Sequence, residues 1–318
     1  MPLALENLLD VKHREKSIVE ILELSPEALK GVSNSDAQKL KEAFGITTIR
    51  QLGENKFFMA AAALARAGMN PDYDPGPPPF WLNKFAQLPD SYYVNHPSGR
   101  FRVHFGGVPY RGRLDDTARV IVVGQDPSTD EAIARRAFVG NAGQRLQKLL
   151  YKTGIVRSYI IINTFAYSII GQANNEMRII AQEPIIKNFR EDLLNTLIER
   201  NPIEAIITLG VGAKEAMSTW NNPENKQMFH LFHPSAQTGL EDNWNTHLPL
   251  LIANITPDNP AIIDATPYSG EWSENTHRMN IPRFDLPYNL PDWHGTEGTN
   301  SNRGPDKIKE ITWTSILS

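Results

Sequence analysis

The chain has 318 residues, 41% of them hydrophobic, which is enough apolar material to bury a sizeable core. It contains no cysteine, and this excludes disulfides, thiolate nucleophiles, iron–sulfur clusters and cysteine-bound zinc. The net charge of −4 neither requires nor excludes a nucleic acid as partner. No apolar run is long enough to span a membrane, and no basic and then apolar leader opens the sequence, so we expect a cytoplasmic protein without a membrane partner.

Residues 1–70 show the three-to-four spacing of leucine, isoleucine and alanine that is typical of helices. Between two of the helical stretches lies Gly31, in a segment that is similar to a helix-hairpin-helix element. In that element a glycine turn directs backbone N–H groups at a DNA phosphate. The element usually has two glycines and only Gly31 is present here, so both a DNA contact at Gly31 and a simple helical packing module remain open.

Three further segments follow this helical region. Residues 71–109 begin with a proline-rich stretch that indicates a linker, followed by an aromatic segment that we expect to wrap around the outside of the core. Residues 110–256 carry the regular pattern of an α/β core. Residues 257–318 are rich in Pro, Asn, Thr, Trp and Tyr without periodicity, and we interpret them as an extension packed on that core.

Apolar strands alternate with helical stretches throughout residues 110–256. The predicted strands are Val120–Val123, Tyr159–Ile162, Ala205–Leu209 and Met228–Phe232. The predicted helices are Glu131–Arg136, Gln144–Lys152, Ile185–Glu199, Gly212–Trp220 and Trp244–Ile255. This alternation predicts βαβ units and therefore a three-layer α/β/α domain with a mostly parallel central sheet.

The first predicted strand is the one around which we expect a ligand site. Val120–Val123 is an unbroken run of β-branched residues, as in a strand buried on both faces. Ligands of open α/β sheets bind beyond the carboxyl ends of the strands, where Gln125, Asp126 and Ser128 follow here. Taken alone, Asp126 is more simply explained as a turn carboxylate that bonds its own backbone, and Ser128 as the N-cap of the next helix.

Three later segments place further polar or aromatic side chains at the ends of predicted elements. Phe138 lies with two glycines in the loop before a helix, Asn163 ends a strand, and His233 ends another in the sequence Leu231–Ser235. In this order, and together with Gly124–Pro127, these segments resemble the uracil-DNA glycosylase superfamily from about residue 119 to residue 255.

The resemblance combines two branches of that superfamily. The sequence Gly-Gln-Asp-Pro at 124–127 is similar to the first motif of the classical uracil glycosylases. The sequence Phe-Val-Gly-Asn-Ala-Gly at 138–143 is more similar to the thermophile-type branch. Members of that branch carry a cysteine-bound iron–sulfur cluster, which this chain cannot build.

The resemblance implies a monofunctional DNA glycosylase that needs no cofactor or metal. Its partner would be single- or double-stranded DNA with a flipped-out pyrimidine. Breaking an N-glycosidic bond puts positive charge on the sugar and negative charge on the base. The resemblance implies that Asp126 positions the water and stabilises the sugar cation, and that His233 donates to the pyrimidine O2. It implies base-binding roles for Gln125, Phe138 and Asn163.

Contacts to DNA are implied at Ser128 and Ser235, and Gln237 stands where the classical enzymes insert a leucine wedge. The tripeptide His-Pro-Ser occurs twice, at His96 and at His233, so it is not specific by itself. Only His233 follows a predicted apolar strand, and it is therefore the one that we assign to the site.

The identity of the base stays open at this point. Classical uracil enzymes have a tyrosine after Gly-Gln-Asp-Pro that excludes 5-substituents, and Ser128 replaces it here. Uracil, as in DNA repair, and bulky 5-modified pyrimidines of bacteriophage DNA, as in phage defence, are both compatible with this replacement. A non-catalytic DNA-binding module on the same fold is a further alternative. An oxidoreductase and a metal hydrolase are disfavoured because G-x-G-x-x-G and metal-ligand spacing are missing.

Overall fold

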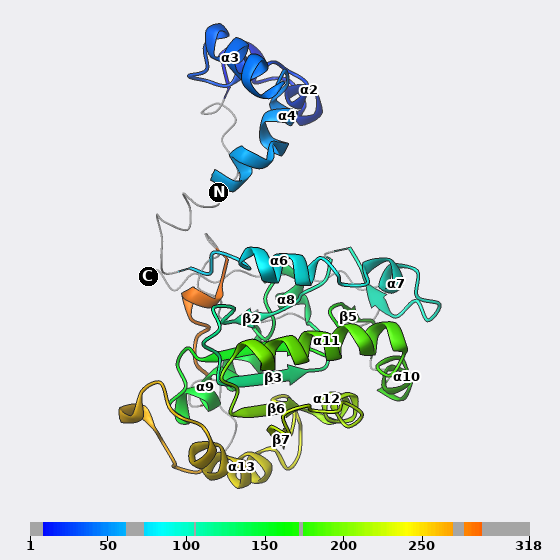
Figure 1. The fold of residues 1–318 in the computed structure, drawn as a ribbon, viewed down its shortest axis with the longest axis vertical. Coiled ribbons are helices and arrows are strands. Elements are labelled where there is room, and N and C mark those ends of the chain that lie inside the picture. Colours follow the sequence, from blue (N-terminus) through cyan, green and yellow to red (C-terminus); the bar gives the residue numbers. More distant parts are fainter. Residues whose placement is uncertain (1–8, 62–72, 105, 172–173, 270–276, 288–318) are drawn as a thin grey trace. The chain divides into compact units, whose positions relative to one another are not determined.

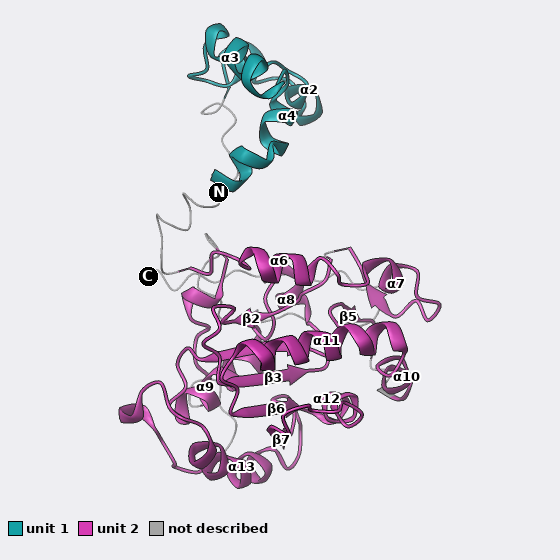
Figure 2. Cartoon of the chain, in the orientation of Figure 1, with its two compact units in different colours: residues 1–71 teal, residues 72–318 magenta. Residues whose placement is uncertain are grey.

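The computed structural model describes residues 9–61, 73–104, 106–171, 174–269 and 277–287. The chain divides into two compact units, residues 1–71 and residues 72–318 (Figure 2). Unit 1 is helical, and unit 2 contains the β-sheet (Figure 1). Within the described residues, no helix is both long and apolar enough to cross a bilayer.

Unit 1 is built from short helices joined by tight turns. They include η1 (Val11–His13), α2 (Ile18–Leu22), η2 (Pro26–Ala28), α3 (Asn34–Phe44) and α4 (Ile49–Glu54). Helix α3 begins after Ser33, whose N–H donates to Asp36 Oδ2 at 3.1 Å, and ends at Gly45 in a left-handed conformation. The turn before α3 contains Gly31 with φ +94°, which glycine tolerates best. The predicted N-terminal helices are therefore present, while a DNA contact at Gly31 stays a prediction.

The centre of unit 2 is a five-stranded sheet of order β2-β4-β3-β6-β7. The strands are β2 (Arg111–Gly112), β3 (Val120–Gly124), β4 (Tyr159–Asn163), β6 (Ala205–Leu209) and β7 (Gln227–Leu231). All neighbours are parallel except the short edge strand β2, which is antiparallel to β4. The prediction of a mostly parallel sheet is confirmed, and each predicted strand lies within one residue of an observed one.

Helices cover both faces of this sheet and complete the predicted three-layer α/β/α fold. Val120 and Val122 face α9 (Asn141–Lys152) and α13 (Leu240–Asn254), whereas Ile121 and Val123 face the opposite layer. That layer contains α6 (Pro79–Phe85), α11 (Pro184–Arg200) and α12 (Val211–Met217) (Figure 1). Since β3 is buried on both faces, its continuous run of β-branched residues is explained by the two helical layers.

Several smaller elements surround the sheet. They are α7 (Asp90–Val94), β1 (Phe101–Arg102), α8 (Thr129–Ala134), β5 (Ser168–Ile169), α10 (Asn174–Ile180), η3 (Pro260–Ile262) and η4 (Arg283–Asp285). The predicted helix at residues 131–136 is shifted by two residues, because it begins directly after Ser128 and ends where Arg135 adopts φ +57°. Helix α13 begins four residues earlier than predicted, directly after the left-handed Gly239. The antiparallel pair β1 and β5 was not predicted.

The C-terminal extension contributes a fully buried carboxylate to unit 2. Asp285 accepts hydrogen bonds from Arg111 Nη1 at 2.9 Å, from Arg113 Nη2 at 2.5 Å and from the Tyr159 hydroxyl at 2.5 Å. Both arginines belong to the β2 region at the edge of the sheet, and Arg111 and Asp285 have no exposed side-chain surface. Asp285 therefore links the extension to the sheet edge and places one negative charge between two buried cations.

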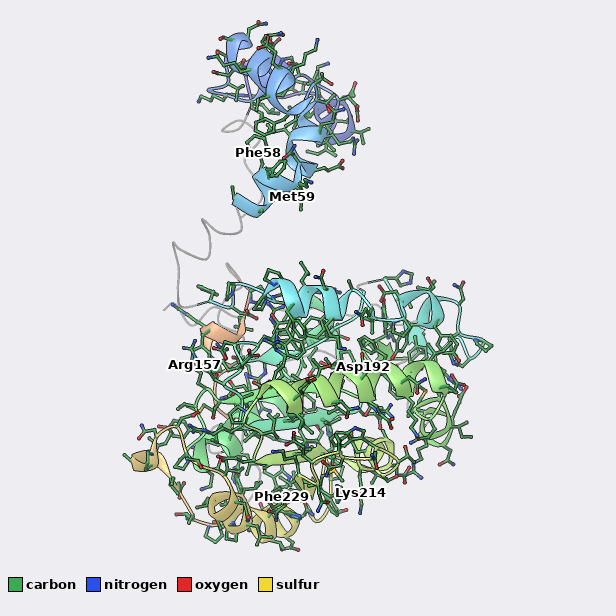
Figure 3. All side chains as sticks on the ribbon, in the orientation of Figure 1. Phe58, Met59, Arg157, Asp192, Lys214 and Phe229 are labelled. Carbon is green, nitrogen blue, oxygen red and sulfur yellow. The ribbon has the colours of Figure 1, made fainter. Side chains whose placement is uncertain are left out.

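We predict that Asp285→Asn lowers the free energy of unfolding of unit 2 by about 3–5 kcal/mol, since the change leaves buried guanidinium groups without an anion. All six tryptophans lie in unit 2, so their fluorescence during urea titration measures this unit. The control is Asp192→Asn on α11 (Figure 3), which removes an ion pair with Lys84. The side chain of Asp192 is 55% exposed. We expect that control to lose less than about 1 kcal/mol. Equal, small losses in both variants would contradict the role of Asp285.

Candidate active site

Side chains from four segments meet beyond the carboxyl ends of the parallel strands. Gln125 and Asp126 follow β3, Asn163 is the last residue of β4, and His233 comes two residues after β7. Phe138 reaches the same place from the loop between α8 and α9. In Figure 1 the arrow of β3 points toward this end of the sheet, where α12 and α10 lie.

Gly124 is the point where two of these side chains come together. It is paired with Asn163 in the register of β3 and β4. A Cβ atom at position 124 would lie 2.2 Å from Cε2 of Phe138 and 2.3 Å from Oδ1 of Asn163. Both distances are far below van der Waals contact, so the ring and the amide occupy the space that any other residue at 124 would fill.

The side-chain amide of Asn163 is buried without a hydrogen-bond partner. The residue is 8% exposed, and neither Oδ1 nor Nδ2 bonds to any residue that the structure describes. Leaving such a group unsatisfied costs about 1–3 kcal/mol. An amide offers a donor and an acceptor side by side, so it matches a ligand edge that presents the complementary pair. Among the described residues, Asn163 thus leaves a buried donor and a buried acceptor without partners.

Phe138 is held in an unusual backbone conformation beside this amide. Its φ is +53°, a region that bulky residues rarely occupy, and the residue is 3% exposed. Gly143 gives room for it, because a Cβ at 143 would lie 1.7 Å from the Phe138 carbonyl oxygen. The ring centroid is 6.3 Å from that of His233 at an interplanar angle of 46°. Local strain of this kind clusters at functional sites.

Donors from two directions orient the half-buried carboxylate of Asp126. The backbone N–H of Ile169 in β5 donates to Oδ2 at 3.1 Å, and Nε2 of Gln125 lies 3.3 Å from Oδ1. Backbone bonds from Thr164 to Gly124 and from Phe165 to Gln125, 2.8 and 2.9 Å long, extend the β3–β4 ladder into the loops. The turn that carries this carboxylate is therefore bonded to the segment that follows β4.

The side chain of Gln125 lies against the start of α12. A Cβ atom at Gly212 would lie 1.9 Å from its Oε1. Gln125 therefore depends on a second glycine for its position, and its carbonyl oxygen accepts the N–H of Phe165. The structure thus brings Gln125 to the same end of the sheet as Asp126, Phe138, Asn163 and His233.

The two His-Pro-Ser tripeptides have the same local turn and different surroundings. In both, the serine N–H donates to Nδ1 of the histidine at 3.2 Å, so the neutral ring carries its proton on Nε2. Nε2 of His96 lies 2.9 Å from Oε2 of Glu183, the residue that precedes α11. His233 instead packs near Phe138, and Arg145 of α9 donates to the Pro234 carbonyl at 2.6 Å. Arg145 was not identified from the sequence.

Three of the four residues expected to contact DNA lie in unit 2, and the fourth lies in unit 1. Ser128 is the N-cap of α8 and is partly exposed. Ser235 and Gln237 are exposed on the loop after His233, where Nε2 of Gln237 donates to the Ser235 carbonyl at 3.2 Å. Gly31 belongs to unit 1. In the described parts of the chain, no three His, Asp or Glu side chains are grouped as metal ligands would be.

A buried carboxyl lies in the first turn of α8, close to Asp126 in sequence. Glu131 is 5% exposed, and its Oε2 accepts the N–H of Ser128 at 2.5 Å. Burial raises the pKa of Glu131 to about 8, and the charges of Asp126 and Asp130 act in the same direction. The sequence indicated Ser128 as the N-cap of this helix, but it did not indicate the burial of Glu131.

We predict that Gly124→Ala pushes the Phe138 ring and the Asn163 amide apart and lowers the free energy of unfolding of unit 2 by about 1–3 kcal/mol, as overpacking does. A crystal structure of the variant and its urea titration measure the two effects. Gly53→Ala in α4 is the matched control, because no heavy atom lies within 4 Å of a Cβ there. An unmoved ring with unchanged stability would show that the crowding at Gly124 is not real.

Comparison with protein families gives one match in this region. The Uracil DNA glycosylase superfamily matches residues 111–248. The matched stretch contains all five strands of the central sheet, and Gln125, Asp126, Phe138, Asn163 and His233 all lie within it. The resemblance proposed from the sequence is confirmed over residues 111–248, which match the uracil-DNA glycosylase superfamily.

Proposed function

We propose that this protein is a monofunctional DNA glycosylase that hydrolyses the N-glycosidic bond of a flipped-out pyrimidine, most simply uracil, and leaves an abasic site. Membership of the superfamily supports a glycosylase-type function on DNA. The observation that carries the finer proposal is the buried Asn163 amide without a partner among the described residues, beside the ring of Phe138. A flipped base would stack on the ring and satisfy the amide.

Asn163 would read the Watson–Crick edge of the base. The uracil edge presents an N–H donor and a carbonyl acceptor, which pair with Oδ1 and Nδ2 respectively. A site built around a buried amide discriminates strongly against ligands that leave it unpaired. Phe138 supplies the flat apolar surface for stacking, and Gln125 lies at the same strand end as a further polar contact.

Bond cleavage would use Asp126 on the sugar side and His233 on the base side. The electron pair of the C1′–N bond leaves with the base, so the sugar becomes cationic and the base anionic. The Asp126 carboxylate stabilises the cation and orients the water whose oxygen bonds to C1′, and the proton lost by that water passes to Asp126 or to solvent. Nε2–H of His233 donates to the base O2 as negative charge accumulates there.

We predict that Asp126→Asn lowers the single-turnover rate of base excision by on the order of 100-fold or more and leaves the affinity for the substrate duplex nearly unchanged. The physical reason is that the anion stabilises charge that is present only in the transition state. The rate is measured by alkaline cleavage of abasic DNA and the affinity by fluorescence anisotropy. A near wild-type rate would exclude Asp126 as the catalytic anion.

The two histidines provide an internal control for that experiment. His233→Ala is expected to be slow, because the donor to the base is lost. His96→Ala is expected to lose stability, since His96 is buried against Glu183, but to keep the rate per folded molecule. The reverse order of rates would mean that the site lies at His96.

A second candidate function follows from Ser128. This small, partly exposed residue follows Pro127 in the turn that carries Asp126, where the superfamily resemblance leads us to expect the wall against 5-substituents. A pocket open on that side would accept a bulky 5-modified pyrimidine, such as those in bacteriophage DNA, and the protein would then act in phage defence. Uracil repair is the alternative that superfamily membership alone favours.

The two candidates predict different substrate profiles. Otherwise identical duplexes carry uracil, thymine opposite guanine, or glucosylated 5-hydroxymethylcytosine, and excision from each is measured under single-turnover conditions. Rapid excision confined to uracil supports repair and eliminates the open pocket, whereas excision of the glucosylated base supports defence. Tight DNA binding without an abasic product from any duplex would favour a non-catalytic DNA-binding module.

A further inference from the structure

His233 has to be oriented without the aid of its own Nε2 atom. In the proposed function, Nε2–H of His233 faces the O2 atom of the base, so no side chain of the protein can hold this nitrogen during the reaction. The other tripeptide shows the contrast, because Nε2 of His96 lies 2.9 Å from the carboxylate of Glu183. The orientation of His233 must therefore come from its Nδ1 atom and from the backbone on either side.

The backbone before His233 is held by α13. The N–H of Phe232 donates to Oδ1 of Asn243 at 2.7 Å, and Nε1 of Trp244 donates to the Phe232 carbonyl at 3.0 Å. On the ring itself, the N–H of Ser235 donates to Nδ1 of His233 at 3.2 Å. These bonds fix the residue before the histidine and one atom of its ring.

The backbone after His233 is held by Arg145 of α9. Pro234 is buried and has no N–H, so its carbonyl is the one backbone group through which a hydrogen bond can hold this residue. Nη1 of Arg145 donates to that carbonyl at 2.6 Å, and the positive charge of the guanidinium strengthens the bond. The two helices that hold the histidine, α9 and α13, pack on the same face of the sheet (Figure 1).

Helix α9 also supports the ring on which the base would stack. Gly140 is the N-cap of this helix and lies two residues after Phe138. A Cβ atom at Gly143, in the first turn, would lie 1.7 Å from the Phe138 carbonyl oxygen. Arg145 follows two residues later, so one short stretch of α9 contacts both the Phe138 segment and the His233 segment. The centroids of the two rings are 6.3 Å apart.

We propose that Arg145 is a positioning residue: by holding the Pro234 carbonyl, it sets the place of the His233 ring relative to a base stacked on Phe138. This inference rests on the proposed glycosylase function. Arg145→Met keeps a long, flexible side chain at this position and removes the N–H donors. The variant therefore releases the Pro234 carbonyl without leaving a large gap beside α9.

The first experiment compares the wild-type full chain with Arg145→Met on the best substrate duplex, in single-turnover reactions with saturating protein. Displacement of the His233 donor from the base is expected to lower the excision rate per folded molecule by about 10- to 100-fold. The dissociation constant for the same duplex with an abasic site is expected to stay within about two-fold, because the proposal gives Arg145 no contact with DNA. A wild-type rate at saturation would overturn the proposal, and lost affinity with that rate would make Arg145 a phosphate contact.

The matched control is Arg119→Met. Arg119 directly precedes β3 and is half-buried like Arg145, and its Nη1 also donates to a backbone carbonyl, that of Thr256, at 3.0 Å. It has a further ion pair with Asp258 at 3.4 Å, so the control loses at least as many contacts. Because these contacts lie at the amino end of β3, we expect the wild-type excision rate per folded molecule. Equal slowing in both variants would contradict a specific role for Arg145.

A second readout does not depend on catalysis. The chain has eight histidines, and long-range ¹H–¹⁵N spectra report which nitrogen of each ring carries the proton. The signals of His233 and His96 are assigned by their loss in His233→Ala and His96→Ala. In Arg145→Met the signals of His233 are expected to shift or broaden, while those of His96 stay unchanged.

Unchanged His233 signals in Arg145→Met would overturn the proposal. A wild-type protein that excises no base would instead overturn the proposed function, and the spectra would still decide whether Arg145 holds the His233 ring.

Discussion

The site depends on the absence of a side chain at Gly124. Parallel pairing of β3 with β4 places Asn163 opposite this glycine. The Phe138 ring, which comes from the α8–α9 loop, lies next to the same glycine. A Cβ would collide with both groups at once, so the ring and the amide can lie this close together only where β3 ends in glycine. The register of the sheet thus determines which polar group lies beside the ring.

The carboxyl groups near this point have different environments and different tasks. Asp126 is half-buried and accepts a bond from the β5 backbone, so it is oriented toward the strand ends. Glu131 is almost fully buried, and burial raises its pKa to about 8, while its Oε2 accepts the backbone N–H of Ser128. A Glu131 carboxyl that is protonated at neutral pH adds no negative charge beside Asp126.

Much of the fold could be predicted because its signals are local. Unbroken β-branched runs identified the buried strands, and their alternation with helices gave the parallel sheet and the three layers. The same strand ends indicated where Asp126, Asn163 and His233 would lie. The order of the motifs was enough to identify the superfamily, which the comparison confirms.

Other features depend on contacts between residues that are distant in sequence. Arg111 and Asp285 are 174 residues apart, and β1 meets β5 across more than sixty, so a single sequence gives no signal for either. The left-handed conformation of Phe138 has no signature, because bulky residues rarely adopt it. The lack of a partner for the Asn163 amide can be seen only when its surroundings are assembled.

The central claim is that water, directed by Asp126, attacks C1′ of the sugar after a base has been bound by Phe138 and Asn163. The most direct measurement is base release from uracil-containing DNA in ¹⁸O-labelled water, with mass spectrometry of both products. Hydrolysis of the N-glycosidic bond predicts a free base without ¹⁸O and no protein–DNA adduct after borohydride; label on the sugar is not decisive, because the aldehyde form of an abasic site exchanges its oxygen with water. Borohydride trapping of a covalent protein–DNA adduct, or label in the base, would contradict it.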